Sequence, residues 1–169
     1  MICFRLYYDK DKEEMWLNEM AARGYAMRWF FLGFYYFEHT KPGEYIYRVD
    51  LLNNWAANKK DYADFMEETG VEVVCQWFLW VILRRKAEGQ PFEMYTDVES
   101  QMEQYSRIRK MMIVGLAVEV TCLLMEIWVY METKGTLALM VMVLAGLFAI
   151  IFAGAVRSYS IKIGELKRM

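Results

Sequence analysis

The chain has 169 residues, of which 57% are hydrophobic and 17% aromatic, and its formal net charge is −2. Residues 1–105 carry 12 basic and 18 acidic side chains, whereas residues 106–169 carry 8 basic and 4 acidic ones. Because affinity for nucleic acid depends on neutralising phosphates with Lys and Arg, the acidic N-terminal part argues against a direct nucleic-acid partner.

The first 105 residues alternate between strand-like and helix-like segments, and the order of the segments occurs twice. Each helix-like segment ends at a glycine, Gly24 or Gly70, the residue that most often caps a helix C-terminus. We predict an α+β domain with an antiparallel sheet, built from two strand–helix–strand–strand units with both helices on one face. The predicted segments are 3–8, 9–23, 25–32 and 34–38, followed by 45–52, 59–69, 71–76 and 78–85.

Two apolar stretches, at about 111–131 and 136–156, fill the remainder, 106–169. Each has about 21 residues, which at about 1.5 Å per residue matches a hydrocarbon core of about 30 Å. We predict a membrane anchor with two transmembrane helices, against the alternative of a buried hairpin in a soluble protein. Basic residues flank the pair outside the short loop, so the positive-inside rule predicts a multi-pass protein of the cell membrane with both termini cytoplasmic.

Glu119 and Glu126 are the unusual residues of the first span. They lie seven positions apart, so a helix places them on nearly one face with Gly115 and Cys122. A carboxyl at this depth costs a few kcal/mol, and the second span has no Lys, Arg, His, Asn or Gln to receive it. Two interpretations stay open. In the first, the face is an acidic seam that pairs with another copy or another membrane protein, or lines a transport path. In the second, the carboxyls are neutral and bond the backbone or a thiol within the hairpin, and Glu126 reaches the outer interface.

Small residues repeat along the second span. Ala145, Ala149 and Ala153 recur every four residues, with Gly146 and Gly154 beside them. Such spacing allows close approach of membrane helices, and the contact predicted between the two spans could by itself account for it.

Aromatic residues are frequent in the first 105 positions. Rings beside a carboxylate can hold an organic cation, and a pocket of this kind would use Trp29, Tyr35, Phe37, Glu38 and Trp80. The alternative is that these side chains form the hairpin core and cross-strand pairs. His39 is the sole histidine, and no catalytic triad, metal-ligand set or phosphate loop accompanies it. We therefore expect no enzyme, no cofactor and no metal.

Four motifs stand out in the first part of the chain: WLNEMAARGY at 16–25, YYFE at 35–38, PGEYIYRVD at 42–50 and PFEMYTD at 91–97. Together and in this order, they resemble the bacterial domain of unknown function 2812 family. The resemblance implies a cytoplasmic domain followed by membrane helices, and gene neighbours that are PadR-type regulators. It supplies no catalytic residues. The element order is also similar to GyrI-like domains, which bind lipophilic cations between two such units.

These observations together predict a membrane-anchored, non-enzymatic sensor or adaptor. Its domain would bind a small lipophilic ligand or a protein partner, and its hairpin would contact the lipid bilayer and a second copy or another membrane protein. The alternative is an accessory subunit of a membrane transport or efflux complex.

Overall fold

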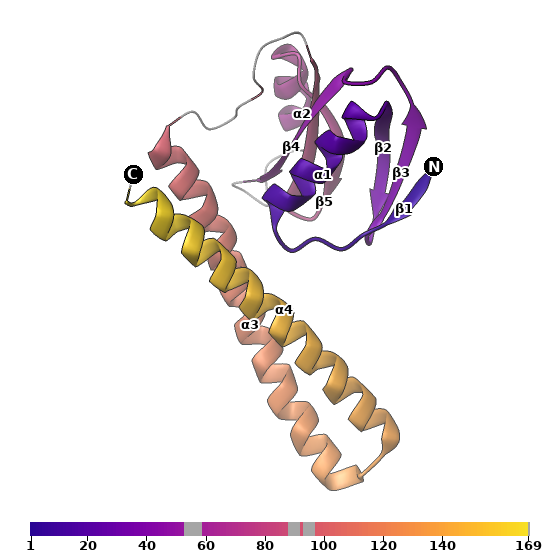
Figure 1. Cartoon of the computed structure of the whole chain (residues 1–169). Coiled ribbons are helices and arrows are strands. Elements are labelled where there is room, and N and C mark those ends of the chain that lie inside the picture. Colours follow the sequence, from indigo (N-terminus) through magenta and orange to yellow (C-terminus); the bar gives the residue numbers. More distant parts are fainter. Residues whose placement is uncertain (53–58, 88–91, 93–96, 169) are drawn as a thin grey trace. The chain divides into compact units, whose positions relative to one another are not determined.

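The structure is a computed structural model of the chain, and it describes residues 1–52, 59–87, 92 and 97–168 (Figure 1). The chain divides into two compact units, Met1–Met94 and Tyr95–Met169. The first unit holds all the strands of the described residues and the second is a helical hairpin. The predicted α+β class is confirmed.

The first unit contains the predicted repeat of strand, helix, strand and strand (Figure 1). Each repeat forms its own three-stranded antiparallel sheet, with order β1-β3-β2 in one and β4-β6-β5 in the other. The elements are β1 (Ile2–Phe4), α1 (Lys10–Ala22), β2 (Tyr25–Phe31), β3 (Phe34–His39), β4 (Tyr45–Leu51), α2 (Lys59–Glu68), β5 (Glu72–Trp77) and β6 (Trp80–Lys86).

Local signals explain where the elements begin and end. The Asp9 carboxylate accepts a hydrogen bond from the Asp11 N–H, which caps the start of α1. Gly24 and Gly70 follow the two helices with φ of 84° and 75°, angles that glycine adopts without strain. The pairing register between the last two strands of each repeat also shifts at an equivalent place. The shift lies between Met27 and Trp29 in β2 and between Val73 and Cys75 in β5. A bulge at the same point of both repeats strengthens the interpretation of a doubled unit.

Helix α1 packs against strands of both sheets. Its Trp16, Leu17 and Met20 join one buried cluster with residues of β2, β3, β4 and β6, including Ile82. Helix α2 contributes Met66 to a second cluster, which contains Val81 and Leu83 of β6. Since adjacent residues of a strand point to opposite faces, the two helices cover opposite faces of the second sheet. The prediction of both helices on one face is therefore wrong, because α1 also covers the sheet of the other repeat.

Polar side chains of α1 satisfy the free edge of β4. The Asn18 side chain accepts from the Tyr47 N–H at 2.8 Å and donates to the Tyr47 carbonyl at 3.0 Å. One turn earlier, the Glu14 carboxylate accepts from the Val49 N–H at 3.1 Å and from the Arg48 guanidinium at 2.9 Å. The helix thus takes the place of a neighbouring strand and ties the two repeats together.

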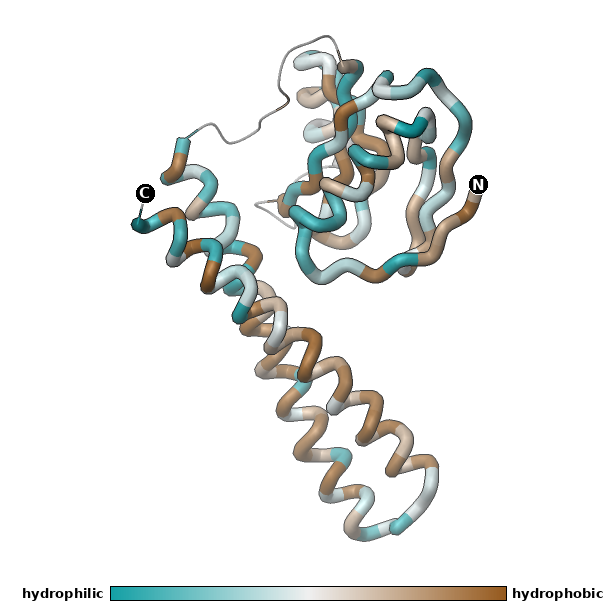
Figure 2. The backbone as a smooth tube through the Cα atoms, in the orientation of Figure 1, coloured by the Kyte–Doolittle hydropathy of each residue, from teal (hydrophilic) through white to brown (hydrophobic). Residues whose placement is uncertain are grey.

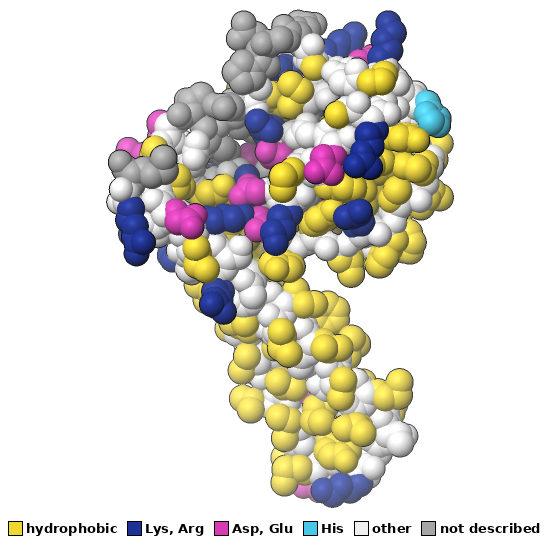
Figure 3. All heavy atoms as spheres, in the orientation of Figure 1, with side chains coloured by type: hydrophobic (Ala, Val, Ile, Leu, Met, Phe, Trp, Pro, Cys, Tyr) yellow, Lys and Arg dark blue, Asp and Glu magenta, His cyan; other side chains and the backbone are white. Residues whose placement is uncertain are grey.

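The second unit consists of α3 (Val98–Thr133) and α4 (Thr136–Leu166). Both helices are long and apolar enough to cross a membrane, judged by length and composition (Figure 2). Hydrophobic side chains cover most of the visible hairpin surface (Figure 3). The helices remain paired beyond the predicted spans, since the rings of Tyr105 and Tyr159 lie 5.9 Å apart. The domain boundary predicted after Tyr105 thus falls inside α3.

Candidate ligand-binding site around Glu13

Glu13 lies in the first turn of α1, on the helix face that enters the core. Positions 13, 16, 17 and 20 share one face of a helix, and Trp16, Leu17 and Met20 are all buried. The carboxyl is therefore carried toward the aromatic cluster instead of toward water.

The hydroxyl of Tyr35 donates a hydrogen bond to Oε1 of the Glu13 carboxyl at 2.7 Å. Burial raises the pKa of Glu13 from 4.5 to about 7, although the bond from Tyr35 favours the ionised form. The same burial, and the neighbouring Glu13, raise the pKa of the Tyr35 phenol. At neutral pH the carboxyl is thus close to its titration midpoint, where a nearby cation has most influence on ionisation.

Aromatic rings surround this carboxyl–phenol pair. Trp16 packs edge-on against Tyr35, with ring centroids 4.8 Å apart at 79°, and Phe30 lies 4.7 Å from Tyr35 on another side. Tyr7, from the segment before α1, lies 5.7 Å from Trp16. Tyr7 and Phe30 are only partly buried, as is Cys75, whose thiol pKa burial raises. These three side chains are among those of the cluster that keep some exposed surface.

The five residues predicted from the sequence do not form a single site. Tyr35 and Phe37 are fully buried in the α1 cluster, and Trp80 packs at its edge. Trp29 and Glu38 lie on the other face of the first sheet, with exposed fractions of 50% and 39%. There Glu38 forms an ion pair with Arg28, which lowers its pKa.

The structure therefore replaces Glu38 by Glu13 as the carboxyl among the rings. The sequence analysis did not single out Glu13, because acidic residues are common at the start of a helix, where they interact favourably with the helix dipole. The available signal was spacing, because Glu13 precedes Trp16 by three positions and Leu17 by four.

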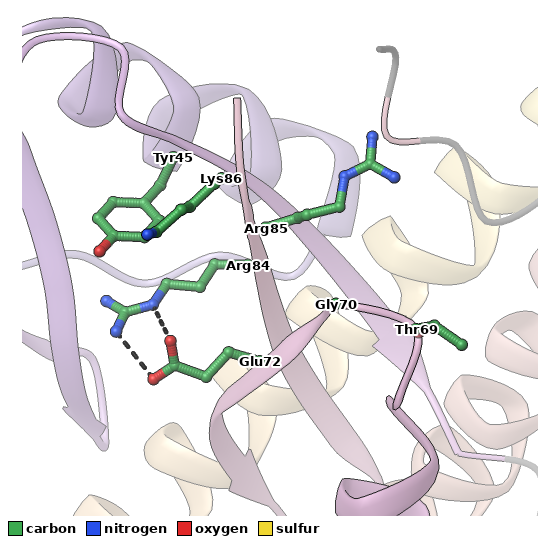
Figure 4. A pocket seen from close by; sticks show the side chains of 7 residues that line it. All are labelled: Tyr45, Thr69, Gly70, Glu72, Arg84, Arg85 and Lys86. Carbon is green, nitrogen blue, oxygen red and sulfur yellow. Dashed lines mark hydrogen bonds and ion pairs between the residues drawn. The ribbon is translucent and has the colours of Figure 1, made fainter. Parts of the chain in front are cut away.

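A second polar site lies at the ends of β5 and β6, in a pocket of roughly 550 Å³ (Figure 4). Buried Arg84 makes two hydrogen bonds of 2.8 Å to the Glu72 carboxylate, and its guanidinium lies 4.6 Å from the centre of the Tyr45 ring. It also donates to the Met27 carbonyl of β2 at 3.1 Å. Glu72 balances the charge of Arg84, so the pair serves chiefly to connect the second sheet to β2.

In the second unit, Gly115, Glu119 and Glu126 are half-buried and Cys122 is exposed. A Cβ at Gly115 would lie 2.7 Å from the Phe152 ring of α4, so glycine is what allows this contact. Among the residues that the structure describes, neither glutamate makes a hydrogen bond or an ion pair.

Part of the small-residue repeat of α4 meets α3. Ala145 is buried and Ala149 is half-buried, as is Gly146, whereas Ala153 and Gly154 are exposed. A repeat of exactly four residues drifts by about 40° per step around a helix with 3.6 residues per turn. Beyond Ala149, half-buried Phe152 and then buried Ala155 occupy the side that faces the partner helix, so a helix-packing role for Ala153 and Gly154 is not supported within the hairpin.

A family model described as "Protein of unknown function (DUF2812)" matches residues 9–117. The match runs from the start of α1 into the first apolar helix and covers well over half of the chain. Neither a curated protein nor a solved structure matches the chain.

Proposed function

This chain belongs to the DUF2812 family, and on that premise we propose that it is a membrane-anchored, non-enzymatic sensor or adaptor whose N-terminal unit binds a small lipophilic cation. The observation that carries the proposal is the half-buried Glu13 carboxyl, which accepts a hydrogen bond from buried Tyr35 beside the aromatic rings and has its pKa raised to about 7. A strongly shifted carboxyl in such surroundings is a mark of functional sites.

The chemistry of the cluster favours a cation over other ligands. An organic cation that reached Glu13 would hold the carboxyl in its ionised form and recover part of the energy lost through burial. The partly buried Phe30 ring would add ring–cation attraction and apolar contact, as the Trp16 ring already does for the Arg5 guanidinium, 5.1 Å from its centre. A neutral ligand would gain the contact but leave the carboxyl protonated.

The C-terminal helices support the anchoring part of the proposal, because both can cross a membrane by length and composition. Basic residues before the first span and after the second span favour an orientation with both termini in the cytoplasm. A lipophilic cation concentrates at membranes, so a tethered domain would meet it there. The N-terminal unit would transmit cation binding by contact with a protein partner, in keeping with the expected link to PadR-type regulation.

The test is a thermal-unfolding series on the full chain in mild detergent, at pH 8, with tetraphenylphosphonium. The wild-type chain and a Glu19→Gln control, altered at an exposed position of α1, should both gain several degrees in Tm. Glu13→Gln should lose this gain in Tm. Any effect of the cation through the detergent should be the same in all three proteins, so the difference between them reports binding at Glu13. An equal shift in all three proteins would disprove binding at Glu13.

A second function, accessory subunit of a membrane transport or efflux complex, is favoured by Glu119 and Glu126. Both are half-buried and lack a partner within the described residues, which suits a contact with a second copy or another membrane protein. Co-purification of that partner should fall when both are changed to Leu, and substrate-dependent proton flux in vesicles should disappear. Unchanged association and the absence of flux in the wild type would remove this alternative.

A further inference from the structure

The two β-hairpins of the first unit end in apolar, backbone-strained turns. Leu32 at the β2–β3 turn and Phe78 at the β5–β6 turn have positive φ angles, of 47° and 57°. Bulky residues rarely adopt such angles, and Asn, Asp or Gly ordinarily fills these positions in a hairpin. Both side chains are nevertheless more than half exposed, at 51% and 53%. The chain thus keeps a large apolar side chain in both places where a small polar residue would suit the backbone better.

The two turns lie at the same edge of the unit, because β2 and β5 run side by side. The Cys75 thiol donates to the Phe30 carbonyl at 3.7 Å, and the rings of Phe30 and Trp77 are 6.3 Å apart. Phe30 is two residues before Leu32, and Trp77 directly precedes Phe78. The turns are therefore neighbours.

A third segment joins the first turn. The Arg5 N–H donates to the Gly33 carbonyl at 2.8 Å. A Cβ at Gly33 would come within 2.7 Å of the Leu6 side chain, which is 74% exposed. The edge is thus built from three separate parts of the chain.

We call this surface the apolar edge. Its members are uncharged and at least 46% exposed, and neither hairpin has a charge within three residues of its turn. With roughly half of each side chain in water, the edge exposes on the order of 600–700 Å² of apolar surface, at or above the largest patch of an ordinary soluble monomer. The members are Phe4, Leu6, Phe31, Leu32, Phe34, Trp77 and Phe78.

We propose that the apolar edge inserts into the boundary between headgroups and acyl chains of the membrane that holds the chain's own helical hairpin. This inference rests on the membrane anchoring proposed above. Trp, Phe and Leu are the side chains that surface-bound segments place at that depth. The edge needs no basic rim, because anchoring by α3 and α4 already supplies the attraction to the membrane.

The tether makes a shallow insertion sufficient. Five residues separate Phe92, which packs in the second core of the first unit, from Val98 at the start of α3. A span of this length reaches at most about 20 Å, and the part of α3 before the predicted span, 98–110, adds about 20 Å. The unit therefore stays within about 40 Å of its membrane, at an effective concentration in the millimolar range. A second copy is the less favoured occupant, because the acidic character of residues 1–105 opposes close approach of two such units.

The test is spin-label accessibility on the full chain in phosphatidylcholine vesicles. Each protein keeps one thiol and has its other cysteines changed to Ser. Leu32→Cys and Phe78→Cys place the label on the apolar edge, and Lys12→Cys places it on the exposed side of α1. Native Cys122, exposed on α3, reports whether the hairpin is in the bilayer. Collisions with oxygen, which enters lipid, are compared with collisions with a water-soluble nickel chelate.

Labels at 32 and 78 should lose nickel contact and gain oxygen contact, as at Cys122, whereas the label at 12 should show the reverse. Nickel contact at 32 and 78 with lipid exposure at Cys122 would overturn the insertion and leave the anchoring intact. Nickel contact at Cys122 would instead refute the anchoring. A third outcome is that the label at 32 or 78 is shielded from both reagents and its spectrum is broadened by the same label on another copy. This outcome would identify a second copy as the occupant and would also overturn the proposal.

Discussion

The Glu13→Gln substitution gives the most direct measure of the buried carboxyl. Gln retains the shape and an oxygen that can accept from Tyr35, but it cannot ionise. In the folded chain burial raises the pKa of Glu13 from 4.5 to about 7. In the unfolded chain the carboxyl returns to water and titrates near its ordinary value.

The sign follows from which state holds the proton. Between pH 4.5 and about 7 the folded state keeps the Glu13 proton and the unfolded state has lost it. The free energy of unfolding therefore falls as pH rises. The stabilisation is complete below pH 4.5 and is lost as pH passes through about 7. A pKa raised by this amount corresponds to about 3 kcal/mol.

The assay is guanidinium unfolding of the full chain in detergent, followed by tryptophan fluorescence at steps from pH 5 to pH 8. Wild type should lose about 2.5 kcal/mol more than Glu13→Gln over this range, so the substituted chain should be the more stable one at pH 8. Glu14, whose pKa is also raised, is present in both proteins and cancels in the difference. The Glu19→Gln control should follow the wild type. Parallel curves for wild type and Glu13→Gln would refute the buried carboxyl.

Three further substitutions test other parts of the structure. Leu32→Asn should raise the free energy of unfolding by about 1 kcal/mol in the same assay, because Asn tolerates the positive φ; a loss of stability would show that the turn is not strained. Gly115→Leu should destabilise the hairpin by about 1–3 kcal/mol, since its Cβ would meet the Phe152 ring. Helical circular dichroism during heating should then show a transition at lower temperature. The control Gly154→Leu, at an open position, should leave the transition temperature unchanged. Arg84→Ala should destabilise the first unit by about 2–3 kcal/mol through loss of its buried hydrogen bonds, and an unchanged unfolding midpoint would contradict its connecting role.

The elements of the first unit could be predicted from the sequence because their signals are local. Gly24 and Gly70 end helices that apolar spacing defines, and the hairpins follow as runs of β-branched and aromatic residues. The hairpin helices were equally visible from their length and hydropathy. These features do not depend on which residues meet across the fold.

The position of α1 could not be predicted in this way. Its contacts with β4 depend on Asn18 and Glu14, whose partners Tyr47 and Val49 lie 29 and 35 positions later in the chain. No periodic pattern within the helix indicates that its polar side chains will satisfy a distant strand edge. The same holds for Ala153, whose repeat suggested helix packing but which the helical geometry rotates away from α3.

One side chain, Phe30, lies between the Glu13 site and the apolar edge. Its ring lies 4.7 Å from Tyr35, the hydrogen-bond partner of Glu13, and 6.3 Å from Trp77, a member of the edge. Phe30 is only partly buried, so a ligand that passed it to reach Glu13 would press against or displace this ring. Any such movement would also displace Trp77, a member of the apolar edge that we place in lipid. A cation that arrives from the membrane would therefore enter the Glu13 site beside the apolar edge, and its binding would change the contact of that edge with lipid.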